Sequence, residues 1–278
     1  MLTGDFVKIS NHWFILNKTD RFYKNLGYNG EYNNAFVNPQ GKGMESNDMK
    51  DNKHPVQDFR FILTLLLVTL CCLGVAMYLR VKSDTNMYQF LTWDMFLAWV
   101  PYIISSCISY TFNMKLTKMS LIWMVPMSAG WLFFLPNSAY LFTEILHSFR
   151  YFNAQEGTQF WIHIDFWYNL TLTFAVAILG LLLSTCSIIQ IHGVLNKLFS
   201  KYINMMVIGV ILMLSSLGVY IGRFNRWNSW DVLSRPWQIV MDIVHDLVAR
   251  NNMVIEFVAI VFLVQIFAYV IVSLLTAR

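Results

Sequence analysis

The sequence predicts an all-α polytopic membrane protein, a bundle of about six transmembrane helices, and three observations support this fold class. Of its 278 residues, 56% are hydrophobic and only 13% are charged, whereas a soluble domain has about 25% charged residues. The mean hydropathy is +0.48 although the N-terminal segment is polar. Apolar runs long enough to cross a bilayer recur along the rest of the chain. A soluble core of this size could not bury so much apolar surface.

Residues 1–58 differ from everything that follows. They are rich in Asn, Lys, Asp and Gly, so we expect a polar, disordered cytoplasmic tail. The apolar patch Trp13–Leu16 is too short to span a membrane, and no signal-peptide pattern is present. Met44 offers an alternative translation start, in which case residues 1–43 would be either absent from the native chain or a dispensable extension of it.

Residues 59–278 are predicted to form the transmembrane domain, because lipid leaves backbone groups without partners unless the spans are helical. The six predicted spans are Phe59–Leu79, Leu91–Phe112, Met119–Leu135, Phe166–Ile189, Ile203–Gly222 and Met253–Leu275. Pro126 and Pro136 in and after the third run predict a kinked span, a break at Pro136 and an interfacial helix restarting at a capping Asn137. A seventh span or a re-entrant segment near Pro136 is the alternative.

The distribution of Lys and Arg predicts a multi-pass protein of the cell membrane with both termini in the cytoplasm. Lysines gather in the connections 113–118 and 196–201. The opposite side has fewer basic residues if the arginines between residues 223 and 250 are left out of the count. We leave them out because they belong to a distinctive motif that indicates a binding site. This orientation places Asp94, Glu144, Asp165 and Asp231 at or near the extracytoplasmic interface.

The strongest single motif is GRFNRWNSWD, residues 222–231. Arg223 and Arg226 share a helical face, and guanidinium groups suit bidentate capture of phosphate or carboxylate. The rings of Trp227 and Trp230 suit the headgroup level of a membrane. Together with Asn228 and Asp231, these residues predict a site for an anionic lipid headgroup. The alternative is an interfacial anchor whose arginines pair with Asp94, Glu144 or Asp231.

The second motif is WLFFLPNSAYLFTE, residues 131–144, which supplies Asn137, Tyr140 and Glu144. A helix N-terminus restarting behind Pro136 would present free N–H groups that attract anions. Glu144 is a weak candidate for a catalytic proton acceptor, as is Asp231. The alternative is a structural one, in which Asn137 only caps a helix and Glu144 is held in a salt bridge.

The sequence predicts no metal site and no cofactor. His163 with Asp165, and Asp242 with His245 and Asp246, lack the further ligands of a metal motif. The segment around Asp242–Asp246 instead predicts an amphipathic helix in the membrane interface with its charges towards water. The basic residues are scattered, so nucleic-acid binding has no support.

Small residues in the fifth predicted span predict close helix packing. Gly218 and Gly222 form a GxxxG pair, which lets two helices approach without a hydrophobic driving force. In a bundle of this size we expect packing inside the chain rather than dimerisation.

Three segments together resemble a family of bacterial multi-pass membrane proteins, domain of unknown function 1361. They are FLPNSAY at residues 134–140, Trp167-Tyr168, and GRFNRWNSWDVLSRP at residues 222–236, and the resemblance covers about residues 91–248. The family pattern usually has an acid where Asn169 stands and often Asp at the position of Glu144. The resemblance implies a membrane protein but supplies no activity.

Three functions follow from these residues. The preferred one is a non-enzymatic protein that binds membrane lipids, through an anionic headgroup, or a partner membrane protein at its outer face. The second is an envelope transferase on a lipid-linked substrate, with Arg223 and Arg226 on phosphate and Glu144 or Asp231 as base. The third is a small transporter, for which the sequence shows no clear internal repeat.

Overall fold

The computed structural model describes residues 5–9, 12–16, 59–83, 88–114, 118–150, 159–227, 231–249 and 252–276. The chain divides into two compact units, Met1–Asp51 and Asn52–Arg278. In the first unit, strand β1 (Asp5–Ile9) pairs antiparallel with β2 (His12–Leu16). Met44 and the remainder of the predicted tail lie outside the described residues, so the predicted disorder of the tail stays a prediction.

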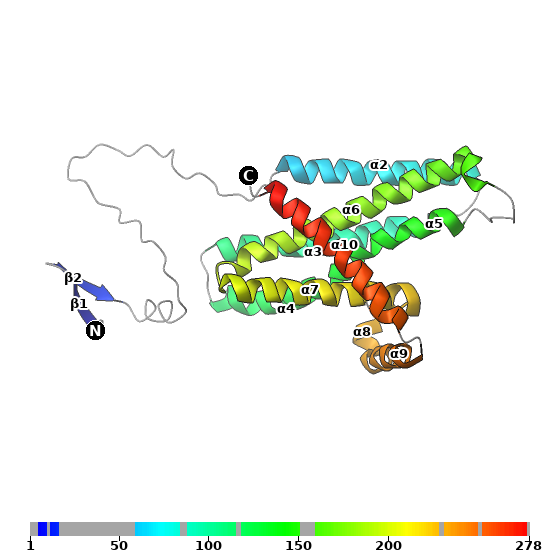
Figure 1. The fold of residues 1–278 in the computed structure, drawn as a ribbon. Coiled ribbons are helices and arrows are strands. Elements are labelled where there is room, and N and C mark those ends of the chain that lie inside the picture. Colours follow the sequence, from blue (N-terminus) through cyan, green and yellow to red (C-terminus); the bar gives the residue numbers. More distant parts are fainter. Residues whose placement is uncertain are drawn as a thin grey trace. The chain divides into compact units, whose positions relative to one another are not determined.

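The second unit is helical throughout its described residues, which confirms the predicted fold class (Figure 1). Its elements are α2 (Phe59–Ser83), α3 (Leu91–Asn113), α4 (Lys118–Tyr140), η2 (Leu141–Glu144), α5 (Ile145–Arg150), η3 (Phe160–Ile162), α6 (Ile164–Leu195), α7 (Lys201–Tyr220), η4 (Ile221–Asn225), α8 (Asp231–Ser234), α9 (Pro236–Ala249) and α10 (Asn252–Thr276). Five of the described helices are long and apolar enough to cross a membrane: α2, α3, α6, α7 extended by η4, and α10. The third predicted span lies in α4, which is not one of these five.

The path of α4 differs from the sequence prediction. The helix runs without interruption through Pro126 and Pro136 to Tyr140, so the break predicted at Pro136 is wrong. Asn137 lies inside the helix and does not cap a new one. Proline is tolerated inside such helices where neighbouring helices support the backbone, and Pro136 packs against α7. After Tyr140 the chain tightens into the 3-10 turn η2 and continues as α5.

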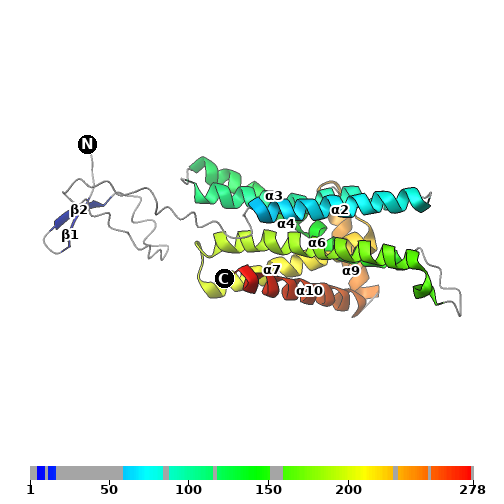
Figure 2. The same cartoon turned by 90° about the horizontal axis from the view of Figure 1, so that it is seen from above.

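Helix α6 occupies the centre of the bundle and packs against α2, α3, α4 and α10 (Figure 2). Its buried face carries residues such as Leu179, Leu183 and Cys186. Hydrogen bonds between side chains tie the neighbouring helices together, as expected where no hydrophobic force acts between helices in lipid. Ser105 of α3 donates to Gln190 of α6, Trp131 of α4 donates to Ser187 of α6, and Gln265 of α10 donates to Ser216 of α7.

Two glycines bring the C-terminal half of α4 into direct contact with α6 and α7. A Cβ atom on Gly218 would lie 2.4 Å from Cγ of Pro136, and one on Gly180 would lie 2.5 Å from the carbonyl oxygen of Ser138. Real Cβ atoms do not approach this closely, so neither position has room for a larger residue. A Cβ atom on Gly222 would touch the ring of Tyr140 at 3.5 Å. The GxxxG pair therefore packs inside the chain, as predicted.

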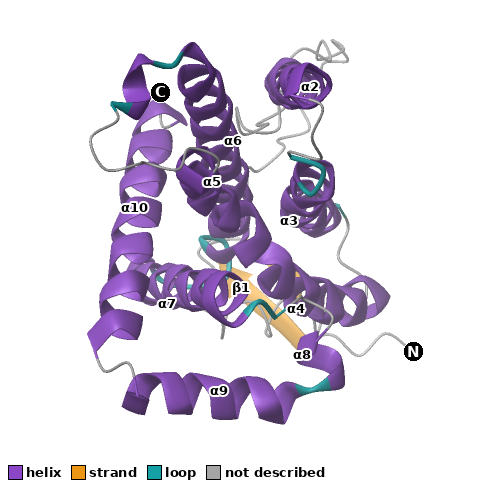
Figure 3. Cartoon of the chain, turned by 90° about the vertical axis from the view of Figure 1, so that its right-hand side faces the viewer, coloured by secondary structure: helices purple, strands orange, loops and turns teal. Residues whose placement is uncertain are grey.

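Helix α9 runs crosswise along one edge of the bundle in Figure 3, where α2, α3 and α6 are seen nearly end-on. Its carboxylates do not face water, which corrects the sequence prediction. Asp246 is buried and accepts hydrogen bonds from Tyr220 and Asn225, while the half-buried Asp242 accepts one from Nε1 of Trp227. An amphipathic sequence pattern cannot distinguish an acidic side chain that faces water from one that attaches its helix to a neighbouring turn by accepting hydrogen bonds from it.

We predict that Gly218→Ala destabilises the protein by about 1–3 kcal/mol, because the added methyl group would overlap the ring of Pro136. The free energy of unfolding in SDS titrations of the detergent-solubilised protein measures this effect. Gly209→Ala is the matched control, since Gly209 lies in the same helix and a Cβ atom added there would have no neighbour within 4 Å. Equal stabilities of the two variants would contradict the assigned contact.

Candidate functional site

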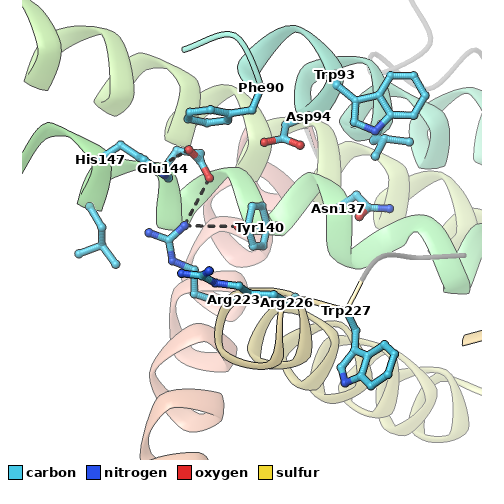
Figure 4. A pocket seen from close by; sticks show the side chains of 13 residues that line it. Phe90, Trp93, Asp94, Asn137, Tyr140, Glu144, His147, Arg223, Arg226 and Trp227 are labelled. Carbon is cyan, nitrogen blue, oxygen red and sulfur yellow. Dashed lines mark hydrogen bonds and ion pairs between the residues drawn. The ribbon is translucent and has the colours of Figure 1, made fainter. Parts of the chain in front are cut away.

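A cavity of about 600 Å³ opens at one end of the bundle (Figure 4). Its lining comes from the start of α3, the end of α4, η2, α5 and the turn that follows α7. These segments meet because consecutive long helices run in opposite directions, so that α3 begins where α4 and α7 end. The lining residues are Phe90, Trp93, Asp94, Leu97, Asn137, Tyr140, Glu144, Leu146, His147, Gly222, Arg223, Arg226 and Trp227.

Glu144 is the most deeply buried charged group of the cavity, with 1% of its surface exposed. Its Oε1 lies 3.6 Å from Nη1 of Arg223, and its Oε2 lies 2.8 Å from Nδ1 of His147. The first distance is too long for a hydrogen bond, and the second contact is short but lacks hydrogen-bond geometry. Among the described residues, the carboxylate is therefore compensated by proximity to two nitrogen groups rather than by directed hydrogen bonds.

Arg223 is held on the protein side of the cavity. Its Nη1 donates to the hydroxyl of Tyr140 at 3.3 Å, and its guanidinium carbon lies 5.9 Å from the centre of the Tyr140 ring. Arg223 stands in η4, a single π-helical turn that widens the end of α7. Such π-turns are frequent at functional sites. With Glu144 also close, Arg223 is engaged by two side chains of the α4–η2 segment.

Arg226 differs from Arg223 in both backbone and contacts. Its φ of 56° lies in the left-handed region, which is uncommon for residues other than glycine. The residues on either side, Asn225 and Trp227, both donate hydrogen bonds to α9, through Asp246 and Asp242. Its own side chain is exposed and makes no hydrogen bond or ion pair with any residue that the structure describes.

Asp94 lies across the cavity from Arg226. It belongs to the first turn of α3, where the helix dipole favours a negative charge. Within the described part of the chain, its carboxylate makes no hydrogen bond and no ion pair within 4 Å. Figure 4 shows Asp94 and Arg226 coming from different elements on opposite sides of the pocket.

Aromatic side chains form much of the remaining wall. The ring of Phe90 lies against His147, with 4.7 Å between the ring centres. Trp93 is 55% exposed and stacks on Phe96, while the hydrogen bond from Trp227 to Asp242 fixes its indole. The cavity thus combines flat apolar surfaces with two opposite charges, Asp94 and Arg226, that form no hydrogen bond and no close ion pair with the described residues.

The structure brings together most of the residues singled out from the sequence. Seven of them line the cavity: Asp94, Asn137, Tyr140, Glu144, Arg223, Arg226 and Trp227. Asp165 lies elsewhere and forms an ion pair of 2.7 Å with Lys82 of α2. Asp231 begins α8 and is not part of the lining. Asn228 and Trp230 lie outside the described residues.

Six lining residues were not among the sequence-predicted site residues: Phe90, Trp93, Leu97, Leu146, His147 and Gly222. The spacing of three between Glu144 and His147 is a signal for His147, because such residues share a helix face. No comparable signal marks the two aromatic residues. The described residues contain no group of three or more His, Cys, Asp or Glu side chains that could hold a metal ion.

A comparison with protein families gives one result. The model of a family described as "Protein of unknown function (DUF1361)" matches residues 93–268, which include most of the cavity lining. No curated protein and no solved structure gives a match.

We predict that Arg223→Gln destabilises the protein by roughly 3 kcal/mol, because it removes the cation beside a buried carboxylate. The double variant with Glu144→Gln should recover much of this loss, since no buried charge then remains. SDS titrations of the four proteins of this cycle measure the coupling. Additive losses in the double variant would show that the two side chains do not depend on each other.

Proposed function

The chain belongs to this family of unknown function, and we propose that its cavity binds the phosphate of an anionic membrane-lipid headgroup. The single observation that carries the proposal is Arg226, which lines the cavity and has no partner among the described side chains. A guanidinium group matches phosphate with two parallel hydrogen bonds. Arg223, held by Glu144 and Tyr140, adds positive charge beside it.

The backbone at Arg226 supports a role in binding. A left-handed conformation at a non-glycine residue costs of the order of 1 kcal/mol and is often found at ligand sites. Hydrogen bonds from Asn225 and Trp227 to α9 hold this conformation from both sides. A turn that is fixed on each side of an arginine presents its guanidinium group in a defined place, which reduces the entropy lost on binding.

The surroundings of the cavity favour a lipid over a partner protein. The protein has several helices long and apolar enough to span a membrane, and α9 runs crosswise along one edge of the bundle with an exposed apolar face that includes Trp237, Met241 and Val248. Such a helix is typical of the headgroup layer of a bilayer. A cavity beside it therefore lies at the depth where lipid phosphates are found.

The two other functions receive less support. A transferase needs a base that reaches its substrate, whereas both carboxylate oxygens of Glu144 are inaccessible and directed at Arg223 and His147. Asp231, the other candidate base, is not part of the lining. A transporter needs a pathway through the bundle, and the cavity lining comes from segments at one end of it.

We further propose that this end of the bundle faces away from the cytoplasm, in the cell membrane. The opposite end of the bundle carries Arg60 at the start of α2, and Lys197 and Lys201 around the start of α7. Short connections rich in these residues are retained in the cytoplasm. Both termini would then be cytoplasmic.

We predict that Arg226→Gln lowers the binding of phosphatidylglycerol to the purified full chain several-fold, because the phosphate loses its bidentate partner. Native mass spectrometry with added lipid measures the bound fraction. Arg235→Gln is the matched control, since Arg235 is an exposed arginine outside the cavity lining. Binding by Arg226→Gln equal to that of the control would refute the proposal.

We predict that a membrane-impermeant maleimide labels Ser234→Cys in intact cells and labels Ser200→Cys only after the membrane is opened. The two serines are exposed and lie at opposite ends of the bundle, one at the end of α8 and the other just before α7. The four native cysteines are first replaced by alanine. The reverse labelling pattern would place the cavity at the cytoplasmic face.

A further inference from the structure

We propose that the ligand of this cavity carries an ammonium group as well as a phosphate, so that the recognised unit is phosphoethanolamine. This inference rests on the proposed phosphate site at Arg226, and it makes the preferred headgroup zwitterionic instead of anionic. It assigns the ammonium group to Asp94 and the phosphate to Arg226, which lie on opposite sides of the pocket.

The charges of the cavity fall into two classes. Glu144 is compensated inside the protein by Arg223 at 3.6 Å and by His147 at 2.8 Å. Asp94 and Arg226 have no comparable partner among the described residues. One negative and one positive group are therefore available to a ligand, and a zwitterion satisfies both.

Asp94 is the group that discriminates between headgroups. The two carboxylates of the cavity, Asp94 and Glu144, are balanced by its two arginines, so a phosphate that engages Arg226 without an accompanying cation leaves the charge of Asp94 facing a second negative group. Like charges at close range are unfavourable, and specificity commonly uses such repulsion. An ammonium group beside Asp94 turns the repulsion into attraction.

The residues next to Asp94 suit a cation as well. Phe90 and Trp93 line the same side of the cavity, and aromatic faces attract ammonium groups. A primary ammonium also donates up to three hydrogen bonds to carboxylate oxygens. A trimethylammonium group has no N–H donor, so a phosphocholine headgroup would use the aromatic faces and the charge of Asp94 but would form no hydrogen bond with the carboxylate.

The cavity is large enough for this unit. Pockets of roughly 300–1,000 Å³ hold small molecules, and about 600 Å³ leaves room for the glycerol portion of a lipid beyond the headgroup. Phosphoethanolamine occurs both as a lipid headgroup and as a free phosphate monoester. The chemistry that the cavity recognises is the same in both.

The test measures binding of three lipids with identical acyl chains to the full chain in detergent, by native mass spectrometry. The lipids are phosphatidylethanolamine, phosphatidylcholine and phosphatidylglycerol. The wild type is expected to bind phosphatidylethanolamine roughly tenfold more tightly than phosphatidylglycerol, as one charge-assisted contact provides. Asp94→Asn should abolish this preference and leave phosphatidylglycerol binding unchanged or stronger.

Asp165→Asn is the matched control, because Asp165 also lies in the first turn of a spanning helix but outside the cavity lining. It should keep the wild-type preference. Equal binding of phosphatidylethanolamine and phosphatidylglycerol by the wild type, or a preference that survives Asp94→Asn, would overturn the inference. Neither result affects the proposed phosphate site, which is tested separately and fails if Arg226→Gln binds phosphatidylglycerol as well as the Arg235→Gln control does.

Soluble phosphoethanolamine distinguishes the two sources. If it displaces bound phosphatidylethanolamine, the headgroup alone is recognised, which supports the inference for a free ligand as well as for a lipid. If it does not displace the lipid while the preference still depends on Asp94, the acyl-linked form is the ligand and the inference holds for lipid. The melting temperature of each variant verifies that it is folded.

Discussion

The contact between Pro136 and Gly218 is the constraint on which the rest of the cavity end depends. Because Gly218 has no side chain, α4 can approach α7 until the proline ring meets the glycine backbone. Both helices then end side by side, α4 at Tyr140 and α7 in the π-turn that carries Arg223. A wider separation of the two helices would leave Arg223 too far from Tyr140 and from Glu144.

The two arginines of one short motif have different physical surroundings. Arg223 stabilises the fold, since the buried Glu144 would otherwise lack a nearby permanent cation. Arg226 makes no such contact with the described residues, and its own backbone is in the left-handed conformation. Their spacing of three residues suggests a common helical face, but the π-turn and the left-handed residue send the two guanidinium groups to different neighbours. Under the proposed function, the structural and binding roles that the sequence left as alternatives belong to separate residues, Arg223 and Arg226.

The helices were predictable within a few residues, for example Leu91–Phe112 against the observed Leu91–Asn113, because lipid permits only apolar helical spans. The sequence also predicted that the motifs at residues 131–144 and 222–231 lie at the same end of the bundle, because successive helices run in opposite directions. The continuity of α4 through Pro136 was not predictable, because it depends on a contact with Gly218, which is far away in the sequence. The ion pair between Asp165 and Lys82 was not predictable either, because a hydropathy pattern does not give the rotation of a helix about its axis.

The attachment of α9 has a mechanical consequence. The helix joins the bundle through Asp242 and Asp246, and their donors Trp227 and Asn225 immediately flank Arg226. Its opposite face is apolar and exposed, with Val248 80% exposed. A force that lifts or tilts α9 therefore acts on both neighbours of Arg226 at once. With α9 in the headgroup layer, as the proposed function has it, the position of this guanidinium group would be coupled to the thickness and lateral pressure of the surrounding bilayer.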